Sequence, residues 1–167
     1  GLEWLNLYYN QLSGLIPPVL GSLSNLGILD LGGNQLSGPT PPELSNLGDL
    51  RQLQLGSNQL SGPIPPELGN LGNLENLILG ANSLDGFIPQ ELGSLSNLES
   101  LILGSNRLFG FIPQELSNLT RLQNLHLRYN QLSCWETSGV LEWAQTVPEA
   151  IWDDPPGTTI CEVYPSP

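Results

Sequence analysis

A motif of the form LxxLxLxxNxL returns every 24 residues along this chain of 167 residues. The leucines that open its copies are Leu2, Leu26, Leu50, Leu74, Leu98 and Leu122. A fixed period of about 20 to 29 residues with this leucine spacing is typical of repeats that stack as the coils of a solenoid. We therefore predict six coils in residues 1–133, numbered here from coil one, and a C-terminal cap in residues 134–167.

The first half of each motif predicts a short strand. Leu5 and Leu7 are two residues apart, so both side chains face the interior while Asn6 between them faces outward. Stacked coils then form a parallel sheet whose outer, concave face carries the variable residues. The asparagine of each motif is expected to bond to backbone groups of its turn, which makes it part of the scaffold. These residues are Asn10, Asn34, Asn58, Asn82, Asn106 and Asn130.

The second half of the motif, GxxPxxLxxL, follows in five of the copies. A proline suits the first position of a short helix, and an acid in the first turn complements the helix dipole. The prolines are Pro17, Pro41, Pro65, Pro89 and Pro113, and the acids are Glu43, Glu67, Glu91 and Glu115. A calcium-binding edge is the alternative interpretation of the acids, but a repeated helix start explains them better. No metal site is predicted.

The complete motif, as in LRQLQLGSNQLSGPIPPELGNLGN at positions 50–73, resembles the plant-type leucine-rich repeat. Extracellular domains of receptor-like kinases and polygalacturonase-inhibiting proteins belong to this subclass. The resemblance implies an α/β solenoid with a concave parallel sheet, a second, lateral sheet and short 3₁₀ helices on the convex side. It implies recognition of proteins, peptides or glycans, not catalysis. Thr40 departs from the pattern, which has isoleucine there, and the paired-cysteine N-terminal cap of plant members is absent.

Composition excludes several kinds of partner. The chain has 16 acidic and 4 basic residues, and its arginines are scattered, so no basic surface exists for nucleic acid or an anionic membrane. No apolar run reaches the roughly 18 residues that a membrane-spanning helix needs. His126 is the only histidine, and no nucleophile is spaced around it, so we expect neither an enzyme nor a cofactor.

The two cysteines, Cys134 and Cys161, lie outside the repeats. They could be unrelated thiols, but both fall where the solenoid must be sealed, which favours a disulfide. Such a bond contributes about 3–4 kcal/mol in the chain-entropy model and requires an oxidising compartment. Asn118 begins the acceptor triplet Asn-Leu-Thr for glycosylation. Together these features predict an extracellular or cell-surface location.

The cap is predicted to contain a helix in the run SGVLEWAQTV, residues 138–147. Ser138 is the expected N-cap, and Pro148 is expected to end the helix. Val140, Trp143, Ala144 and Val147 then share one face. The segment DDPPG at 153–157 predicts a turn. Three tryptophans of the cap region are expected to cover the last coil rather than bind sugar: Trp135, Trp143 and Trp152.

The variable residues of the concave face gather at the two ends of the repeat array. Coil one presents Trp4, Asn6, Tyr8 and Tyr9, and coil six presents His126, Arg128 and Tyr129. Glycine, serine and alanine fill the strip between them. Aromatic residues and arginine dominate binding hot spots, so the two ends form a candidate binding site. The alternative is that these aromatics shield the terminal coils.

A second candidate surface follows the glycine of each GxxP segment. The residue after that glycine is apolar in all five coils: Leu15, Pro39, Pro63, Phe87 and Phe111. Phe109 adds to this lateral edge, and Phe87 is expected to stack on Phe111 about 5 Å away. A contiguous apolar patch usually marks an interface. We therefore predict that Leu15, Phe87, Phe109 and Phe111 pack against another chain, a neighbouring domain or an N-terminal segment that precedes this sequence.

The leading functional hypothesis is a non-catalytic extracellular module that binds a protein, peptide or glycan through its concave face and lateral edge. The alternative is a structural protein that self-associates through the first coil or the lateral edge, because a first coil without a cap exposes apolar surface. Adhesion to ice or a mineral is a lesser alternative, since the outward threonine ladder expected for it is missing.

Overall fold

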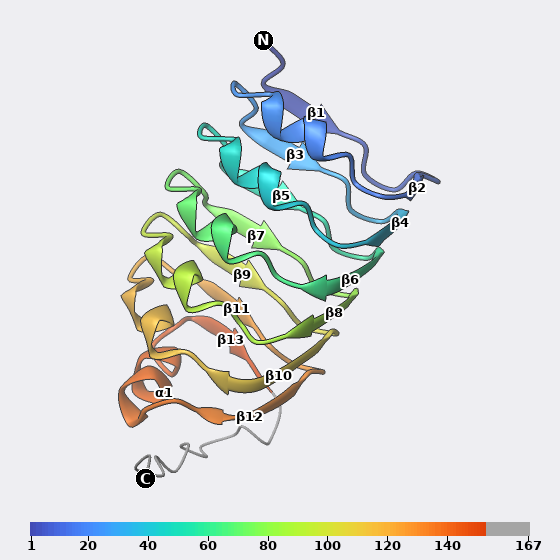
Figure 1. The fold of residues 1–167 in the computed structure, drawn as a ribbon. Helices are drawn as coiled ribbons and strands as arrows, with labels where there is room; N and C mark the ends of the chain where they lie inside the picture. Colours follow the sequence, from blue (N-terminus) through green and yellow to red (C-terminus); the bar gives the residue numbers. More distant parts are fainter. Residues whose placement is uncertain (153–167) are drawn as a thin grey trace, which may run out of the picture.

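The computed structural model describes residues 1–152, which wind into a stack of coils with the N-terminus at one end of the stack (Figure 1). Each coil contributes one strand to a main sheet and one to a second sheet (Figure 1). Short 3₁₀ helices complete the coils. This is the leucine-rich-repeat solenoid that the motif predicts. Cys161 and the turn expected at 153–157 lie outside the described residues.

The main sheet is parallel and has seven strands in the order of the chain. Leu5 pairs with Leu29, and Leu29 pairs with Leu53, so each residue lies beside its equivalent one period on. The leucines therefore stack in columns inside the sheet. The strands are β1 (Trp4–Asn6), β3 (Ile28–Asp30), β5 (Gln52–Gln54), β7 (Asn76–Ile78), β9 (Ser100–Ile102), β11 (Asn124–His126) and β13 (Glu149–Ile151).

The second sheet is also parallel, but its register is different. Gly14 pairs with Leu36 and Gly62 with Leu84, so partners are 22 positions apart instead of a full period. Each coil is thus sheared by two residues relative to the next on this side. The strands are β2 (Ser13–Gly14), β4 (Gln35–Gly38), β6 (Gln59–Pro63), β8 (Ser83–Gly86), β10 (Arg107–Ile112) and β12 (Gln131–Trp135).

A 3₁₀ helix follows the second-sheet strand in five coils, with an acid in the first turn of the last four. The prolines predicted to open these helices lie one residue earlier, as N-caps. Pro65, for example, has φ −63° and ψ 123°, because its ring fixes φ while its ψ stays extended. The helices are η1 (Pro18–Ser22), η2 (Pro42–Asn46), η3 (Pro66–Asn70), η4 (Gln90–Ser94) and η5 (Gln114–Asn118).

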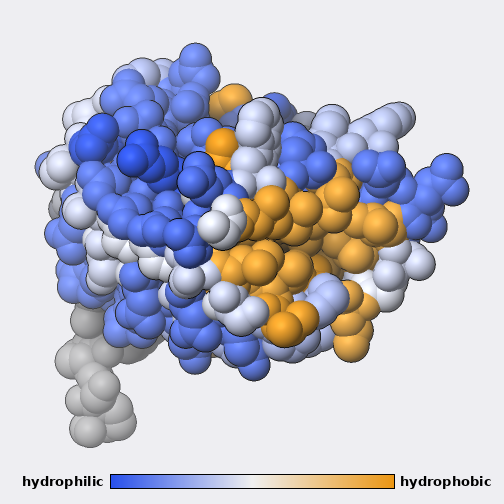
Figure 2. Space-filling view, turned by 90° about the horizontal axis from the view of Figure 1, so that it is seen from above, coloured by the Kyte–Doolittle hydropathy of each residue, from blue (hydrophilic) through white to orange (hydrophobic). Residues whose placement is uncertain are grey.

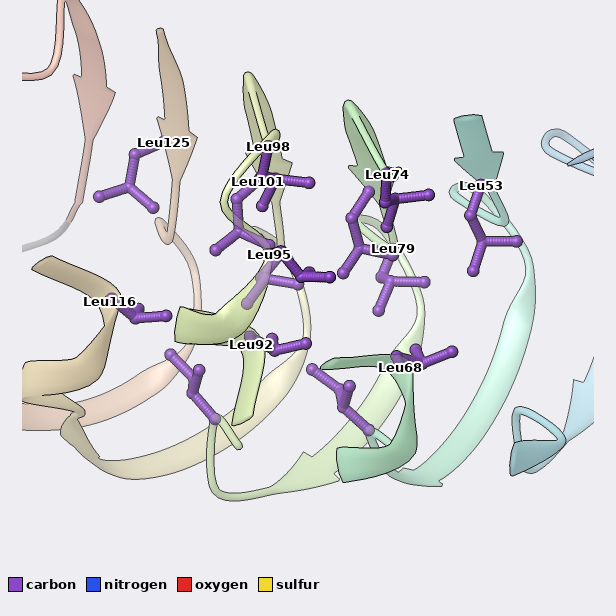
Figure 3. Packing of buried hydrophobic residues seen from close by; sticks show 14 of the residues in the cluster. Leu53, Leu68, Leu74, Leu79, Leu92, Leu95, Leu98, Leu101, Leu116 and Leu125 are labelled. Carbon is purple, nitrogen blue, oxygen red and sulfur yellow. The ribbon is translucent and has the colours of Figure 1, made fainter. Parts of the chain in front are cut away.

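The core is a continuous column of leucine side chains between the sheets and the 3₁₀ helices. Figure 3 shows Leu68, Leu92 and Leu116 pointing from the helices toward leucines of the main-sheet strands. Leu53, Leu77 and most other core leucines are fully buried. Burying one leucine contributes about 1.5–3 kcal/mol. The few leucines of a single coil do not offset the entropy that is lost when its backbone becomes ordered. Neighbouring coils therefore stabilise each other.

The asparagines join adjacent coils, as their spacing predicts. Asn34 donates from Nδ2 to the carbonyl oxygens of Leu7, at 3.0 Å, and Leu31, at 3.0 Å. Its Oδ1 accepts a hydrogen bond from the backbone N–H of Leu12 in the preceding coil, at 3.0 Å. Asn58, Asn82, Asn106 and Asn130 repeat these bonds. The turn of each coil leaves several backbone carbonyl groups without a partner in the sheets, and the asparagine side chains supply the missing hydrogen bonds.

The cap helix α1 (Ser138–Ala144) differs from the prediction at both ends. Thr137 is the N-cap, and its Oγ1 accepts a hydrogen bond from Val140 N–H, because Ser138 is already helical. The helix also ends before Pro148. The chain then returns to the main sheet as β13, which the sequence did not predict.

Aromatic side chains of the cap cover coil six. Trp135 is completely buried, and its ring meets Trp152 edge-on at 5.1 Å between centroids. Trp143 is half-buried and packs against the core. Leu125, Leu127 and Leu132 of coil six are buried beneath this end of the molecule. The boundary between repeats and cap at residue 133 stays a prediction, and strand β12 runs across it.

Coil one, at the opposite end, exposes apolar side chains. Figure 2 looks onto this end, where a broad hydrophobic area is rimmed by hydrophilic residues. Leu2, Leu7 and Leu12 are each more than a third exposed. A hollow of about 260 Å³ is lined by Leu5, Leu12, Leu20 and other residues of coils one and two. The stack of described residues therefore presents its leucine column to the surface at this end.

Candidate functional site

The outward residues of the main sheet form straight rows across the coils. One row runs through Asn6, Asp30, Gln54, Ile78, Ile102, His126 and Ile151. The strand register places each of these side chains next to its neighbours in the row. Asn6 and Asp30 also fix the turn beyond the strand, because their side-chain oxygens accept hydrogen bonds from the N–H groups of Tyr8 and Gly32. Asn6 is thereby partly engaged in the scaffold.

Two residues further along coils two to five, glycines form the floor of the concave face. A Cβ atom at Gly56 would lie 3.1 Å from the carbonyl oxygen of Gly80. The same approach recurs between Gly80 and Gly104, and between Gly104 and the carbonyl of Arg128 at 3.0 Å. Contacts this short leave little room for a side chain and favour glycine, so the strip has a structural reason. The absence of side chains also leaves a channel above the backbone.

This channel is a groove of about 280 Å³ over coils three to six, which we call the concave groove. Its sides are apolar, with Ile78 and Ile102 from the row described above. Its C-terminal end is formed by three residues of the binding site that the sequence predicts: His126, Arg128 and Tyr129. The guanidinium of Arg128 lies 4.8 Å from the centroid of the Tyr129 ring, a cation–π distance. The concave groove thus combines apolar walls with a charged, aromatic end.

Coil one does not contribute to the concave groove. Tyr8 and Tyr9 lie 5.9 Å apart and lean over Gly32 and Gly33, where their ring atoms occupy the space a side chain would need. Both rings stay largely exposed, as does Trp4. Tyr9 and Tyr129 share a left-handed backbone conformation, with φ of 53° and 60°. The two predicted patches therefore lie at separate ends of one face, and only the C-terminal patch borders the concave groove.

The lateral edge corrects one predicted contact. Phe87 and Phe111 are 6.4 Å apart and tilted, whereas Phe87 meets Phe109 edge-on at 4.9 Å. The reason is the register of the second sheet: Leu108 pairs with Gly86, which brings Phe109 opposite Phe87. The repeat period of 24 residues in the sequence instead predicts Phe111 as the neighbour of Phe87. All three rings are about half exposed.

These apolar side chains also protect backbone. Phe87 lies against Gly110, and Leu15 lies against Gly38, so closely that a Cβ atom on either glycine would require the neighbouring side chain to move. Both glycines have positive φ, 84° and 74°, and form the bend of the second sheet. Part of the apolar character of the lateral edge is thus explained within the chain. Leu15 remains two-thirds exposed.

The other predicted site residues lie apart from these surfaces. Asn118 is exposed at the end of η5, and its glycosylation stays a prediction. Cys134 is half-buried in β12, and its bond to Cys161 stays a prediction because Cys161 is outside the described range. Between residues 1 and 152, no three metal-binding side chains of His, Cys, Asp or Glu come together. Among the same residues, no helix has the length and hydrophobicity to cross a bilayer.

The concave site predicted from the sequence did not include Ile78 and Ile102. Their signal was present: in the fourth and fifth coils, the segment LILG places a β-branched apolar residue at an outward strand position. Both side chains are half-buried in the folded chain, which requires an explanation beyond strand formation. The row of paired residues supplies it, since the two isoleucines are neighbours in the sheet and line the groove.

Comparison with known proteins agrees with this architecture. A family model described as leucine rich repeat matches residues 1–61 and 65–132. A search of curated protein sequences found no match.

Solved structures of plant receptors are similar to the chain. One is the leucine-rich-repeat ectodomain of the receptor kinase GASSHO1/SCHENGEN3 from Arabidopsis thaliana, in complex with CASPARIAN STRIP INTEGRITY FACTOR 2. It is 44% identical, with a TM-score of 0.80 over 83% of this chain and 17% of that one. Another is the Arabidopsis receptor kinase HAESA in complex with the peptide hormone IDA and the co-receptor SERK1. It is 38% identical, with a TM-score of 0.82 over 94% of this chain and 26% of that one.

A plant ice-binding protein is also similar, at 34% identity and a TM-score of 0.74 over 83% of this chain and 44% of that one. The chain thus spans about a fifth to less than half of the length of these three proteins. The family model and the receptor structures agree with the motif, the two parallel sheets and the 3₁₀ helices. The chain belongs to the leucine-rich repeat family, in its plant-type form.

Proposed function

We propose that this chain is a non-catalytic extracellular recognition module that binds an extended peptide, or an extended segment of a protein, in the concave groove. The observation that carries the proposal is the groove itself, with Ile78 and Ile102 as walls and Tyr129 at its end. A rigid glycine floor lets a ligand backbone approach the sheet closely. Rigid apolar walls with a few polar groups at one end suit a ligand with alternating side chains.

The similar receptor structures support a peptide or protein ligand over other classes. The GASSHO1/SCHENGEN3 ectodomain is in complex with CASPARIAN STRIP INTEGRITY FACTOR 2, and HAESA is in complex with a peptide hormone and a co-receptor. Both are domains of plant membrane receptors, which supports an extracellular location for this chain. A glycan is a ligand that the concave face could also take, but a largely apolar groove favours side chains over hydroxyl groups.

Selection from a displayed library of random twelve-residue peptides tests the proposal. We expect binders whose affinity falls about tenfold or more in Ile102→Glu, because a carboxylate would replace an apolar wall. The matched control is Gln59→Glu, which adds the same charge on the second sheet and should leave affinity unchanged. Tyr129→Ala should also weaken binding. Gly56→Arg is a poor test, since the close approach of Gly80 would disturb the sheet.

The proposal fails if every selected peptide binds Ile102→Glu and Tyr129→Ala as tightly as the unchanged chain. The predicted patch at coil one is tested in the same assay by Tyr9→Ala, whose side chain is four-fifths exposed and contributes little to stability. A loss confined to Tyr9→Ala would place the ligand at coil one instead of in the concave groove.

Self-association is a second candidate function, favoured by the exposed apolar end of coil one and by the phenylalanines of the lateral edge. Buried in a dimer, these surfaces would be removed from water. Sedimentation at several concentrations tests this candidate: a mass that rises with concentration supports it, and a constant monomer mass rejects it. A Phe87→Ser, Phe111→Ser double variant then distinguishes the lateral edge, which alone it alters, from the end of coil one.

Ice adhesion is the remaining candidate, and the similarity to a plant ice-binding protein favours it. Flat rows of outward residues exist on the main sheet, but they are mixed in chemistry, with asparagine, aspartate, glutamine, isoleucine and histidine in a single row. Measurement of thermal hysteresis tests this candidate directly. Ice crystals that grow unshaped in the presence of the protein would reject it.

A further inference from the structure

Ion pairs connect neighbouring coils along the edge of the main sheet where the strands begin. Arg51 lies 3.7 Å from Glu75 in the next coil. Arg121 binds Glu99 at 2.9 Å, and its other terminal nitrogen donates to Asn97 Oδ1, also at 2.9 Å. Arg51, Glu75 and Glu99 lie directly before their strands, and Arg121 lies three residues before β11. Along this edge, acids and arginines of adjacent coils therefore neutralise each other.

Coils one and two break this pattern. Gly27 occupies the position that Arg51 holds one coil further on, and backbone hydrogen bonds of 2.8 Å place Gly27 between Glu3 and Arg51. The carboxylate of Glu3 thus faces a residue without a side chain. Within the described part of the chain, neither Glu3 nor Asp49 forms an ion pair. Glu75 and Glu99 each pair with an arginine, whereas these two acids do not.

The missing side chain leaves a hollow of about 510 Å³, which we call the edge hollow. Glu3, Trp4, Asp49 and Asn73 line it around Gly27. The Trp4 side chain is 62% exposed, so an indole face is available to a ligand. The carboxylates of Glu3 and Asp49, the amide oxygen of Asn73 and the indole of Trp4 offer hydrogen-bond acceptors and a π surface around this hollow. Arg51 also borders the hollow, but its charge is directed to Glu75.

We propose that the edge hollow binds the guanidinium group of an arginine side chain in a basic peptide partner. Indole is the most favourable side chain for a cation–π contact, and carboxylates accept the paired N–H groups of a guanidinium. The net charge of −12 attracts a basic partner over longer range. The inference deepens the proposed function, because it adds an arginine-specific subsite beside the concave groove of a peptide-binding module.

Nα-acetyl-arginine methylamide is a suitable probe, since it carries the side chain alone. The indole N–H resonance of Trp4, one of four tryptophans, is assigned by its loss in Trp4→Leu. We expect the probe to shift this resonance at low salt and the shift to diminish as sodium chloride is added. The citrulline analogue has the same shape but no charge, and should cause no shift.

Variants locate the effect. The double variant Glu3→Gln, Asp49→Asn should raise the dissociation constant for the probe about fivefold, because exposed charge contacts are lost. The double control Glu67→Gln with Glu91→Gln removes the same charge on the 3₁₀ helices and should have no such effect. Gly27→Arg should fill the edge hollow and abolish the response. That variant is compatible with the fold, since a Cβ atom at Gly27 meets nothing closer than 3.5 Å.

Several results would overturn the inference. Equal shifts from arginine and citrulline would exclude recognition of a cation. A shift with neutral oligosaccharides but none with arginine would make the edge hollow a glycan site. Equal weakening in the two charge-removed double variants would reduce the effect to overall charge. These experiments report on Trp4, whereas the peptide selection reports on Ile102. A negative result at the edge hollow therefore does not contradict the proposal for the concave groove, and the reverse also holds.

Discussion

At the scale of residues, Thr40 occupies a position that is isoleucine in the other coils: Ile16, Ile64, Ile88 and Ile112. Its side chain is 2% exposed, and its hydroxyl has no hydrogen-bond partner among residues 1–152. A buried hydroxyl without a partner loses its bonds to water and gains nothing in return. Coil two therefore carries a polar group where its neighbours carry only apolar contacts.

Thr40→Val should raise the free energy of unfolding by about 1 kcal/mol, because a methyl group replaces the unsatisfied hydroxyl at nearly the same volume. Urea denaturation followed by circular dichroism measures the change. Thr120→Val is the matched control: Thr120 is exposed, so the same substitution should change stability by less than about 0.5 kcal/mol. A destabilised Thr40→Val would indicate that the hydroxyl is satisfied in solution.

At the scale of elements, the sequence predicted the strands and the 3₁₀ helices because each follows from local spacing. LxL places two leucines on one face, and proline with its fixed φ prepares the helix. The register of the second sheet could not be predicted in this way. The repeat period shows which residues of different coils are equivalent. It does not show which residues pair in the second sheet, where partners are 22 positions apart. Phe87 was therefore expected to stack on Phe111 instead of on Phe109. Strand β13 was missed because its three residues lack the leucine pattern.

The packing of successive 3₁₀ helices predicts a strong effect at one glycine. A Cβ atom at Gly69 in η3 would lie 2.4 Å from the carbonyl oxygen of Glu91 in η4. Gly69→Ala should therefore lower the free energy of unfolding by about 1–3 kcal/mol, the cost of forcing two packed elements apart. The comparison is Gly72→Ala, where an added Cβ atom meets nothing within 4 Å.

Thermal denaturation of the two alanine variants measures this difference. Equal melting temperatures would show that η3 and η4 separate without cost. The same column of the convex side holds Gly21 and Gly93, where a Cβ atom would lie 2.1 Å and 2.3 Å from the carbonyl oxygens of Glu43 and Glu115. It also holds Ser45 and Ser117, so the requirement for glycine differs from coil to coil. This detail, again, depends on how closely two coils approach and is not readable from the motif.

At the scale of the whole molecule, each coil contacts only its neighbours, so stability is distributed along one dimension. The cap closes one end with Trp135, Trp152 and helix α1, and the main sheet continues into β13. The concave groove borders that closed end. The candidate site was predictable in part: His126, Arg128 and Tyr129 stood out by residue type, while Ile78 and Ile102 gained meaning only from their pairing across strands.

The disulfide predicted between Cys134 and Cys161 belongs to this scale. Cys161→Ser should lower stability by about 3–4 kcal/mol if the bond closes the cap, because the unfolded chain loses a constraint. Hydrogen exchange should then show β13 and β11 losing protection before β3 and β5. Two free thiols in the unreduced protein, found by mass spectrometry, would contradict the prediction.

The asparagine bonds give the array a polarity. From Asn34 onward, each Oδ1 accepts a hydrogen bond from a backbone N–H of the coil before it, as Asn130 does from Leu108, so every turn is completed by the coil that follows. Deleting coil one would free one amide oxygen that water can solvate. Deleting coil six would leave the backbone N–H of Leu108 without its acceptor at a part-buried position, a more costly loss. The two termini are therefore unequal as places to shorten or extend the protein: added repeats are better supported when they precede coil one than when they replace the cap.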